Sequence, residues 1–86
     1  MNINKLISIV KKKIEDQLIV ESISVEDKSF LHKNHSGNQP DKYHLKLTIK
    51  SNELIKKTKI ERSKKIHKIL HDEIKNYIHS IEILIC

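Results

Sequence analysis

The sequence predicts a single α+β domain over residues 1–86, with its elements in the order α-β-β-α-β. Two segments place apolar residues at helical spacing, and three segments carry the β-branched or alternating residues that are typical of strands. A three-stranded sheet that both helices cover on one face buries all of these apolar stripes together. A chain of 86 residues has room for only one domain with a modest core.

The first helix is predicted over about residues 3–16, with either Asn2 or Asn4 as its N-cap. Its apolar residues fall on one stripe, which consists of Ile3, Leu6, Ile7, Val10 and Ile14. A strand is predicted over residues 18–25, because β-branched residues are frequent there. In that strand Ile19, Ile23 and Val25 share a parity and are expected to point to one face.

A polar loop is predicted over residues 28–42, and loops of that length in compact domains are often functional. Residues 43–51 then alternate almost perfectly between apolar and polar side chains, which makes this segment the clearest strand. Its apolar side is formed by Tyr43, Leu45, Leu47 and Ile49, and we expect the helices to cover that side.

A second helix is predicted over about residues 57–77 and a third strand over residues 78–85. The apolar stripe of the helix consists of Ile66, Ile69, Leu70, Ile74 and Tyr77. In the strand, one parity is shared by His79, Ile81, Ile83 and Ile85. If the second and third strands are parallel, the helix between them is expected to form a right-handed crossover.

Composition excludes several classes of function. The single cysteine, Cys86, rules out a disulfide framework, a zinc ribbon and a CxxC redox site. The single glycine, Gly37, rules out a P-loop, a GxGxxG turn and a GxxG clamp for RNA. No apolar run is long enough for a membrane span, and the first residues lack the order of a signal peptide, so we expect a cytoplasmic protein without membrane contact.

Histidines are the most informative residues for chemistry, since the chain has six of them. Ser29, His32 and Asp27 lack a glycine-made oxyanion site, so we do not expect an enzyme. His67 and His71 are four residues apart and either chelate a metal or belong to a solvated helix face, which is the favoured interpretation. One loop and two strand starts are expected to bring three histidines to one sheet edge: His35, His44 and His79. Imidazole binds zinc, copper and iron, so this cluster could form the histidine side of a shared iron–sulfur cluster whose thiols come from elsewhere.

The net charge of +6 is a weaker indication, because lysine accounts for all but one of the 17 basic residues. The start of the second helix is nevertheless basic, and a DNA-binding surface there would consist of Arg62, Lys64, Lys65 and Lys68. A solvated helix face is the alternative, because one arginine and few aromatic residues leave little for base reading or stacking.

The stretch from Glu26 to Ile83 resembles the BolA family. Ser29, His32 and His35 match the family's Ser and His residues after the first strand, and Tyr43-His44-Leu45-Lys46 matches the start of the second strand. The remaining matches are Arg62, which opens the long helix, Leu70 and Glu73 within it, and Ile78-His79-Ser80-Ile81 at the third strand. The resemblance implies a fold similar to a class II KH domain without the GxxG loop.

The resemblance also implies a partner and a metal cluster. A monothiol glutaredoxin would form a heterodimer with the chain, around a bridging [2Fe-2S] cluster that the glutaredoxin cysteine and a glutathione thiol hold on the other side. His79 matches the family's histidine ligand, and either His35 or His44 would be the second ligand. The implied role is an adaptor in iron–sulfur cluster trafficking or iron homeostasis, and the alternative is a DNA-binding regulator. Alone, the chain would bind no cluster and would be a monomer or a weak homodimer.

Overall fold

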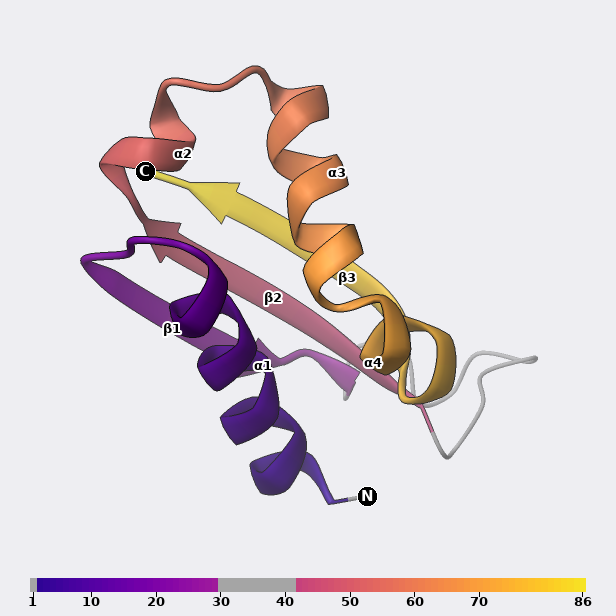
Figure 1. Ribbon diagram of the computed structural model, residues 1–86. Coiled ribbons are helices and arrows are strands. Elements are labelled where there is room, and N and C mark those ends of the chain that lie inside the picture. The colour runs from indigo at the N-terminus through magenta and orange to yellow at the C-terminus, as the bar shows by residue number, and fades with distance from the viewer. Residues whose placement is uncertain (1, 30–41) are drawn as a thin grey trace.

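The structure is a computed structural model that describes residues 2–29 and 42–86. Three strands form one sheet in the order β1-β2-β3, with bounds β1 Ser22–Asp27, β2 Tyr43–Lys50 and β3 Ile78–Ile85. The helices are α1 Ile3–Gln17, α2 Asn52–Ile55, α3 Lys59–Ile69 and α4 His71–Asn76. All the main helices lie on one face of the sheet, so the predicted α+β class is confirmed (Figure 1).

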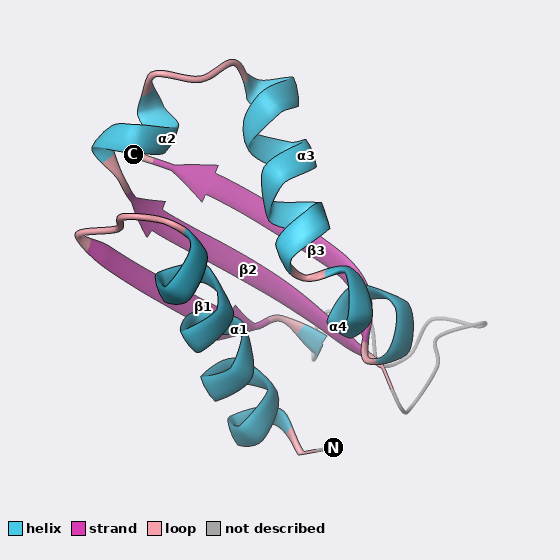
Figure 2. Ribbon diagram, viewed as in Figure 1, coloured by secondary structure: helices cyan, strands magenta, loops and turns pink. Residues whose placement is uncertain are grey.

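The sheet is mixed. β1 runs antiparallel to β2, and β2 runs parallel to β3. In Figure 2 the helices lie in front of the sheet, and β3 lies to the right of β2 when their arrows point upward. The connection from β2 through the helices to β3 is therefore the right-handed crossover that the sequence predicts for parallel strands.

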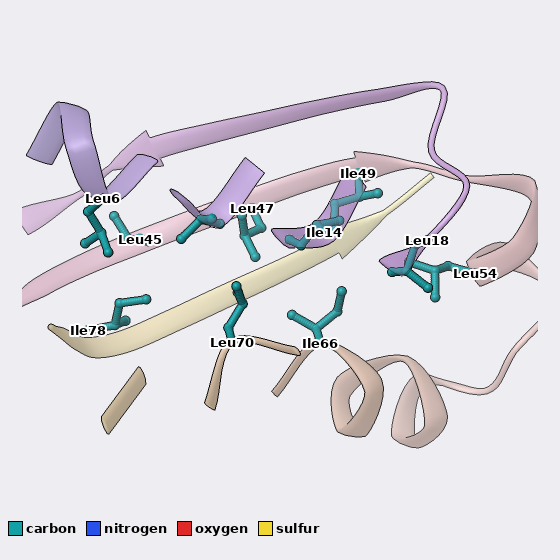
Figure 3. Close-up of a cluster of buried hydrophobic side chains, with 11 residues drawn as sticks. Leu6, Ile14, Leu18, Leu45, Leu47, Ile49, Leu54, Ile66, Leu70 and Ile78 are labelled. Atoms are coloured by element: carbon teal, nitrogen blue, oxygen red, sulfur yellow. The ribbon is translucent and has the colours of Figure 1, made fainter. Parts of the chain in front are cut away.

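The core lies between the sheet and the helix layer. Leu45, Leu47 and Ile49 of β2 are at most 2% exposed, because β2 is the central strand and the helices cover this face. Figure 3 shows side chains of the helices meeting these residues, among them Leu6, Ile14, Leu54, Ile66 and Leu70. None of the described helices is long and apolar enough to cross a membrane.

The first helix agrees with its prediction, and Asn2 is the N-cap because its side chain accepts a hydrogen bond from the Lys5 N–H. The strand predicted over residues 18–25 begins later, at Ser22. Leu18 instead caps the end of α1 and packs in the core. Ile19 is 78% exposed, so its predicted place on the inner face beside Ile23 is wrong.

The helix predicted over residues 57–77 is two helices, and a short helix precedes them. Ser51 caps α2, and Thr58 begins α3 with a capping box in which Thr58 and Glu61 satisfy each other's backbone N–H groups. Leu70 has φ −100° and ψ 20°, which ends α3 and starts α4 without interrupting the buried stripe. Most of the loop predicted over residues 28–42 lies outside the described residues.

Candidate functional site

Two histidines meet where β2 and β3 begin. The ring centroids of His44 and His79 are 4.9 Å apart, and the two ring planes are tilted by 51°. His44 is 6% exposed, whereas His79 is exposed. The sheet therefore carries a pair of imidazoles at this corner, one held inside the fold and one open to solvent.

A β-bulge produces this meeting. Tyr43 pairs with Ile78 and His44 pairs with Ser80, so His79 is an extra residue on β3 between two consecutive pairs. Ile78 is buried, while the two residues that follow it are both exposed. The predicted parity of His79 with Ile81 is therefore wrong, because strict alternation cannot anticipate the extra residue that turns a side chain to another direction.

Hydrogen bonds to other described residues hold His44 in place. The ring atom Nδ1 lies 2.7 Å from Oγ of Ser80, and the hydroxyl can donate or accept according to the tautomer. The backbone N–H of His44 donates to Oγ of Ser29 at 3.0 Å, and its carbonyl accepts from the Lys28 N–H at 2.7 Å. The N–H of Ser29 in turn donates to a carboxylate oxygen of Asp27 at 2.9 Å. The end of β1 thus fixes the backbone of His44, and β3 fixes its ring.

Charges next to the histidine pair are compensated. The Lys28 ammonium lies 2.9 Å from the Glu26 carboxylate, and this hydrogen bond is the main cause that lowers the pKa of Glu26. Lys46 is aligned across the sheet with Glu26 on β1 and Glu82 on β3. A shallow pocket beside these residues includes His44 and Ser80 in its lining.

The predicted metal ligands are only partly covered by the described residues. His44 and His79 are brought together, while His35 lies outside the described residues. Within the described ranges, no group of three or more His, Cys, Asp or Glu residues could hold a metal ion. Cys86 follows the last residue of β3, at the opposite end of the strand from His79.

Two serines were not among the predicted site residues. Ser80 contacts the His44 ring directly and Ser29 holds the His44 backbone. Both positions had a signal in the sequence, because Ser29 belongs to the matched family motif and Ser80 directly follows His79. Their roles depend on strand register, which the sequence pattern leaves open.

The residues predicted for DNA binding do not act as one group. The Arg62 guanidinium donates to the backbone carbonyls of Leu54, Ile55 and Lys57 at 2.9 to 3.0 Å, so it closes the turn between α2 and α3. Nζ of Lys65 lies 3.6 Å from a carboxylate oxygen of Glu53. The other two predicted residues, Lys64 and Lys68, are exposed on α3.

The two remaining histidines of the helices have local partners. His67 donates from Nδ1 to the carbonyl of Ser63 at 2.7 Å, and Nδ1 of His71 lies 3.4 Å from a carboxylate oxygen of Asp72. Both histidines are exposed, and they lie in separate helices, α3 and α4. This arrangement agrees with the favoured interpretation of a solvated helix face.

Comparisons with known proteins agree on one family. The model of the family described as BolA-like protein matches residues 14–85. The structure is similar to the BolA domain of SufE1 from Arabidopsis thaliana, with 29% identity, a TM-score of 0.74, and coverage of 88% of this chain and 84% of that one. It is also similar to BolA1 from Arabidopsis thaliana, with 21% identity, a TM-score of 0.74, and coverage of 91% and 86%. The solution structure of BolA1 from Mus musculus matches with 18% identity and a TM-score of 0.74, over 92% of this chain and 62% of that one. A search of curated proteins finds no match.

Proposed function

The chain belongs to the BolA-like family, and from this premise we propose that it is an adaptor that binds a monothiol glutaredoxin and supplies histidine ligands to a bridging [2Fe-2S] cluster. The BolA-like family is not a known class of enzymes. The proposed role is therefore binding and delivery, in iron–sulfur cluster trafficking or iron homeostasis. The observation that carries the proposal is the pairing of the His44 and His79 rings at one corner of the sheet.

The donor set fits an iron–sulfur cluster that two proteins share. Imidazole nitrogens replace two cysteines on one iron in known histidine-ligated [2Fe-2S] centres, and this replacement raises the reduction potential. His79 is exposed and is open to a partner that brings thiolates. The only cysteine of the chain lies at the far end of β3, so in the proposed complex the thiols come from glutaredoxin and glutathione.

The two histidines would have different tasks. His79 is the primary ligand, because its ring is exposed at the start of an edge strand. The His44 ring is engaged through Nδ1 with Ser80, so the serine would set the orientation in which this imidazole meets the iron. His35 is the alternative second ligand and lies outside the described residues.

Reconstitution with a monothiol glutaredoxin tests the proposal. The chain is mixed with the glutaredoxin, ferrous iron, sulfide and glutathione without oxygen, and the complex is isolated by size. We expect a heterodimer whose visible absorption and circular dichroism differ from those of the cluster-bound glutaredoxin homodimer. His79→Ala should abolish that difference, because the iron loses the exposed imidazole.

Three matched variants complete this experiment. His67→Ala removes an exposed histidine of α3 that bonds within its own helix, and it should leave the heterodimer spectrum unchanged. His44→Ala and His35→Ala identify the second ligand, because only the variant that loses a ligand should alter the spectrum. A spectrum that His79→Ala leaves unchanged would refute the ligand assignment.

A further inference from the structure

The outer edge of β3 is available for strand pairing. Among the described strands, β3 has β2 as its only neighbour, so its other edge faces away from the sheet. Beyond the end of β3, the Cys86 N–H donates to the Ile49 carbonyl, and the Cys86 carbonyl accepts from the Ser51 N–H. Residues of a strand alternate in the direction of their backbone groups. The N–H and C=O groups that point outward therefore belong to Ile81, Ile83 and Ile85.

A groove runs between this edge and α3. One wall is formed by the half-buried side chains of Ile81, Ile83 and Ile85, and the other is formed by α3 with Lys59, Arg62 and His67. No carboxylate is among the described residues that line the groove. The groove thus combines unpaired backbone groups, an aliphatic wall and a cationic wall.

We propose that the outer edge of β3 binds an extended acidic peptide segment of a partner protein, which adds to the sheet as a further strand. A peptide backbone supplies the alternating donors and acceptors that the outward groups of β3 need. Side chains of the added strand would alternate between the groove and the open face of the sheet. In the groove, a glutamate can pack its stem on Ile83 and place its carboxylate near Lys59. On the open face, Glu82 disfavours acidic residues, so the other positions of the segment should be neutral.

Charge and composition favour this occupant over two others. Two copies of this chain would each bring a net charge of +6 to the interface, so a second copy is electrostatically disfavoured. A single-stranded nucleic acid would gain affinity from large aromatic side chains that stack on bases, and the described residues that line the groove include no Phe, Tyr or Trp. The proposal does not depend on the histidine pair or on iron, because neither His44 nor His79 lines the groove.

Amide hydrogen exchange on the purified chain, without iron or glutaredoxin, tests the proposal. The probe is an eight-residue peptide that alternates Glu and Val, and its control is the same peptide with Lys in place of Glu. At ten times the Kd of the acidic peptide, we expect exchange at Ile81, Ile83 and Ile85 to slow about tenfold. Glu82 and Leu84 are the internal control, because their N–H groups point to β2 and should change little.

Two variants that change the net charge by the same amount distinguish binding in the groove from general electrostatic attraction to the chain. Lys59→Glu reverses a charge in the groove wall and should weaken binding of the acidic peptide about fivefold. Lys12→Glu reverses the charge of an exposed lysine on α1 and should leave the affinity within about twofold.

Four results would overturn the proposal. The first is that the acidic peptide does not slow exchange at the three outward amides. The second is that Lys59→Glu and Lys12→Glu weaken binding of the acidic peptide equally. The third is protection of the same amides that rises with protein concentration in the absence of peptide, which would assign the edge to a second copy of the chain. The fourth is tighter binding by an eight-nucleotide oligothymidine than by the peptide, which would assign the groove to single-stranded DNA.

Discussion

At the scale of single residues, the orientation of the His44 ring depends on the hydroxyl of Ser80. The 2.7 Å contact between Oγ and Nδ1 selects which nitrogen faces the serine, while the contacts of Ser29 and Lys28 fix the His44 backbone. Partners that orient a histidine ligand commonly change metal affinity by 10- to 100-fold when they are removed. Ser80 is thus a positioning residue in the proposed cluster site.

Ser80→Ala should therefore change the state of His44 in the free chain. Without the hydroxyl we expect a different tautomer balance for His44, which is measured from the ¹⁵N chemical shifts of the imidazole nitrogens. Ser80→Thr keeps a hydroxyl at this position and should preserve the original shifts. Identical shifts in the Ala variant would mean that Ser80 does not set the ring.

Arg62 has a structural role, although it lies in a run of basic residues that suggests a binding surface. Its guanidinium donates hydrogen bonds to two backbone carbonyls at the end of α2 and to one in the turn that follows. Arg62→Lys keeps the charge but loses the fork geometry, so we expect the free energy of unfolding to fall by about 1–2 kcal/mol. Urea unfolding measures the change, and Lys64→Ala, on the same helix, should stay within about 0.5 kcal/mol. Equal stability of the Arg62→Lys variant would contradict the structural role.

At the scale of elements, the sequence predicts the helices and strands that have a regular apolar pattern. It does not predict the features that depend on helix caps or on strand register. α1 and β2 end within one residue of their predicted bounds, and β3 has the predicted bounds, because their apolar patterns are regular. The break at Leu70 is invisible to the pattern, since the apolar stripe continues from Ile66 through Leu70 itself to Ile74. The meeting of the two histidines could be anticipated, because both lie at strand starts. The direction of the His79 side chain could not, because the bulge at His79 depends on how β2 and β3 pair.

The capping box gives a prediction for α3. Thr58 accepts a hydrogen bond from the Glu61 N–H, and a Glu61 carboxylate oxygen accepts from the Thr58 N–H. Thr58→Ala removes the cap and should lower the free energy of unfolding by about 1 kcal/mol in urea unfolding. Thr58→Ser keeps the capping hydroxyl and should retain most of the stability. A larger loss in the Ser variant than in the Ala variant would show that the methyl group, not the cap, matters here.

At the scale of the whole molecule, an ion pair connects the first helix to the last. Nζ of Lys13 on α1 lies 2.9 and 2.8 Å from the two carboxylate oxygens of Glu73 on α4. The Glu73 side chain is 8% exposed and that of Lys13 is 39% exposed. Solvent therefore reaches Lys13 but hardly reaches Glu73, and it screens the attraction between the two charges only in part. The hydrogen bond from Lys13 to Glu73 is the main cause that raises the pKa of Lys13 above its usual value of 10.5. The two ends of the helix layer are therefore linked by a contact that depends on the charge of Lys13.

This link should appear in the pH dependence of stability. A pKa that is higher in the folded state gives stability that is fully present below the unfolded value of 10.5 and is lost as the pH rises through the folded value. We expect the stability difference between the original chain and Lys13→Met to be constant from pH 7 to about pH 10 and to shrink above that. Lys12→Met, on the same helix, should show no such step. A difference that grows above pH 10.5 would contradict this account.

The most direct test of the central claim is pulsed EPR on the reduced cluster of the heterodimer, with ¹⁵N in this chain alone. If His79 is a ligand, strongly coupled ¹⁵N from an imidazole of this chain should appear in the spectrum. The coupling from His79 should disappear in His79→Ala and persist in His67→Ala. A cluster that shows no nitrogen coupling from this chain, or one whose coupling His79→Ala leaves intact, would contradict the assignment.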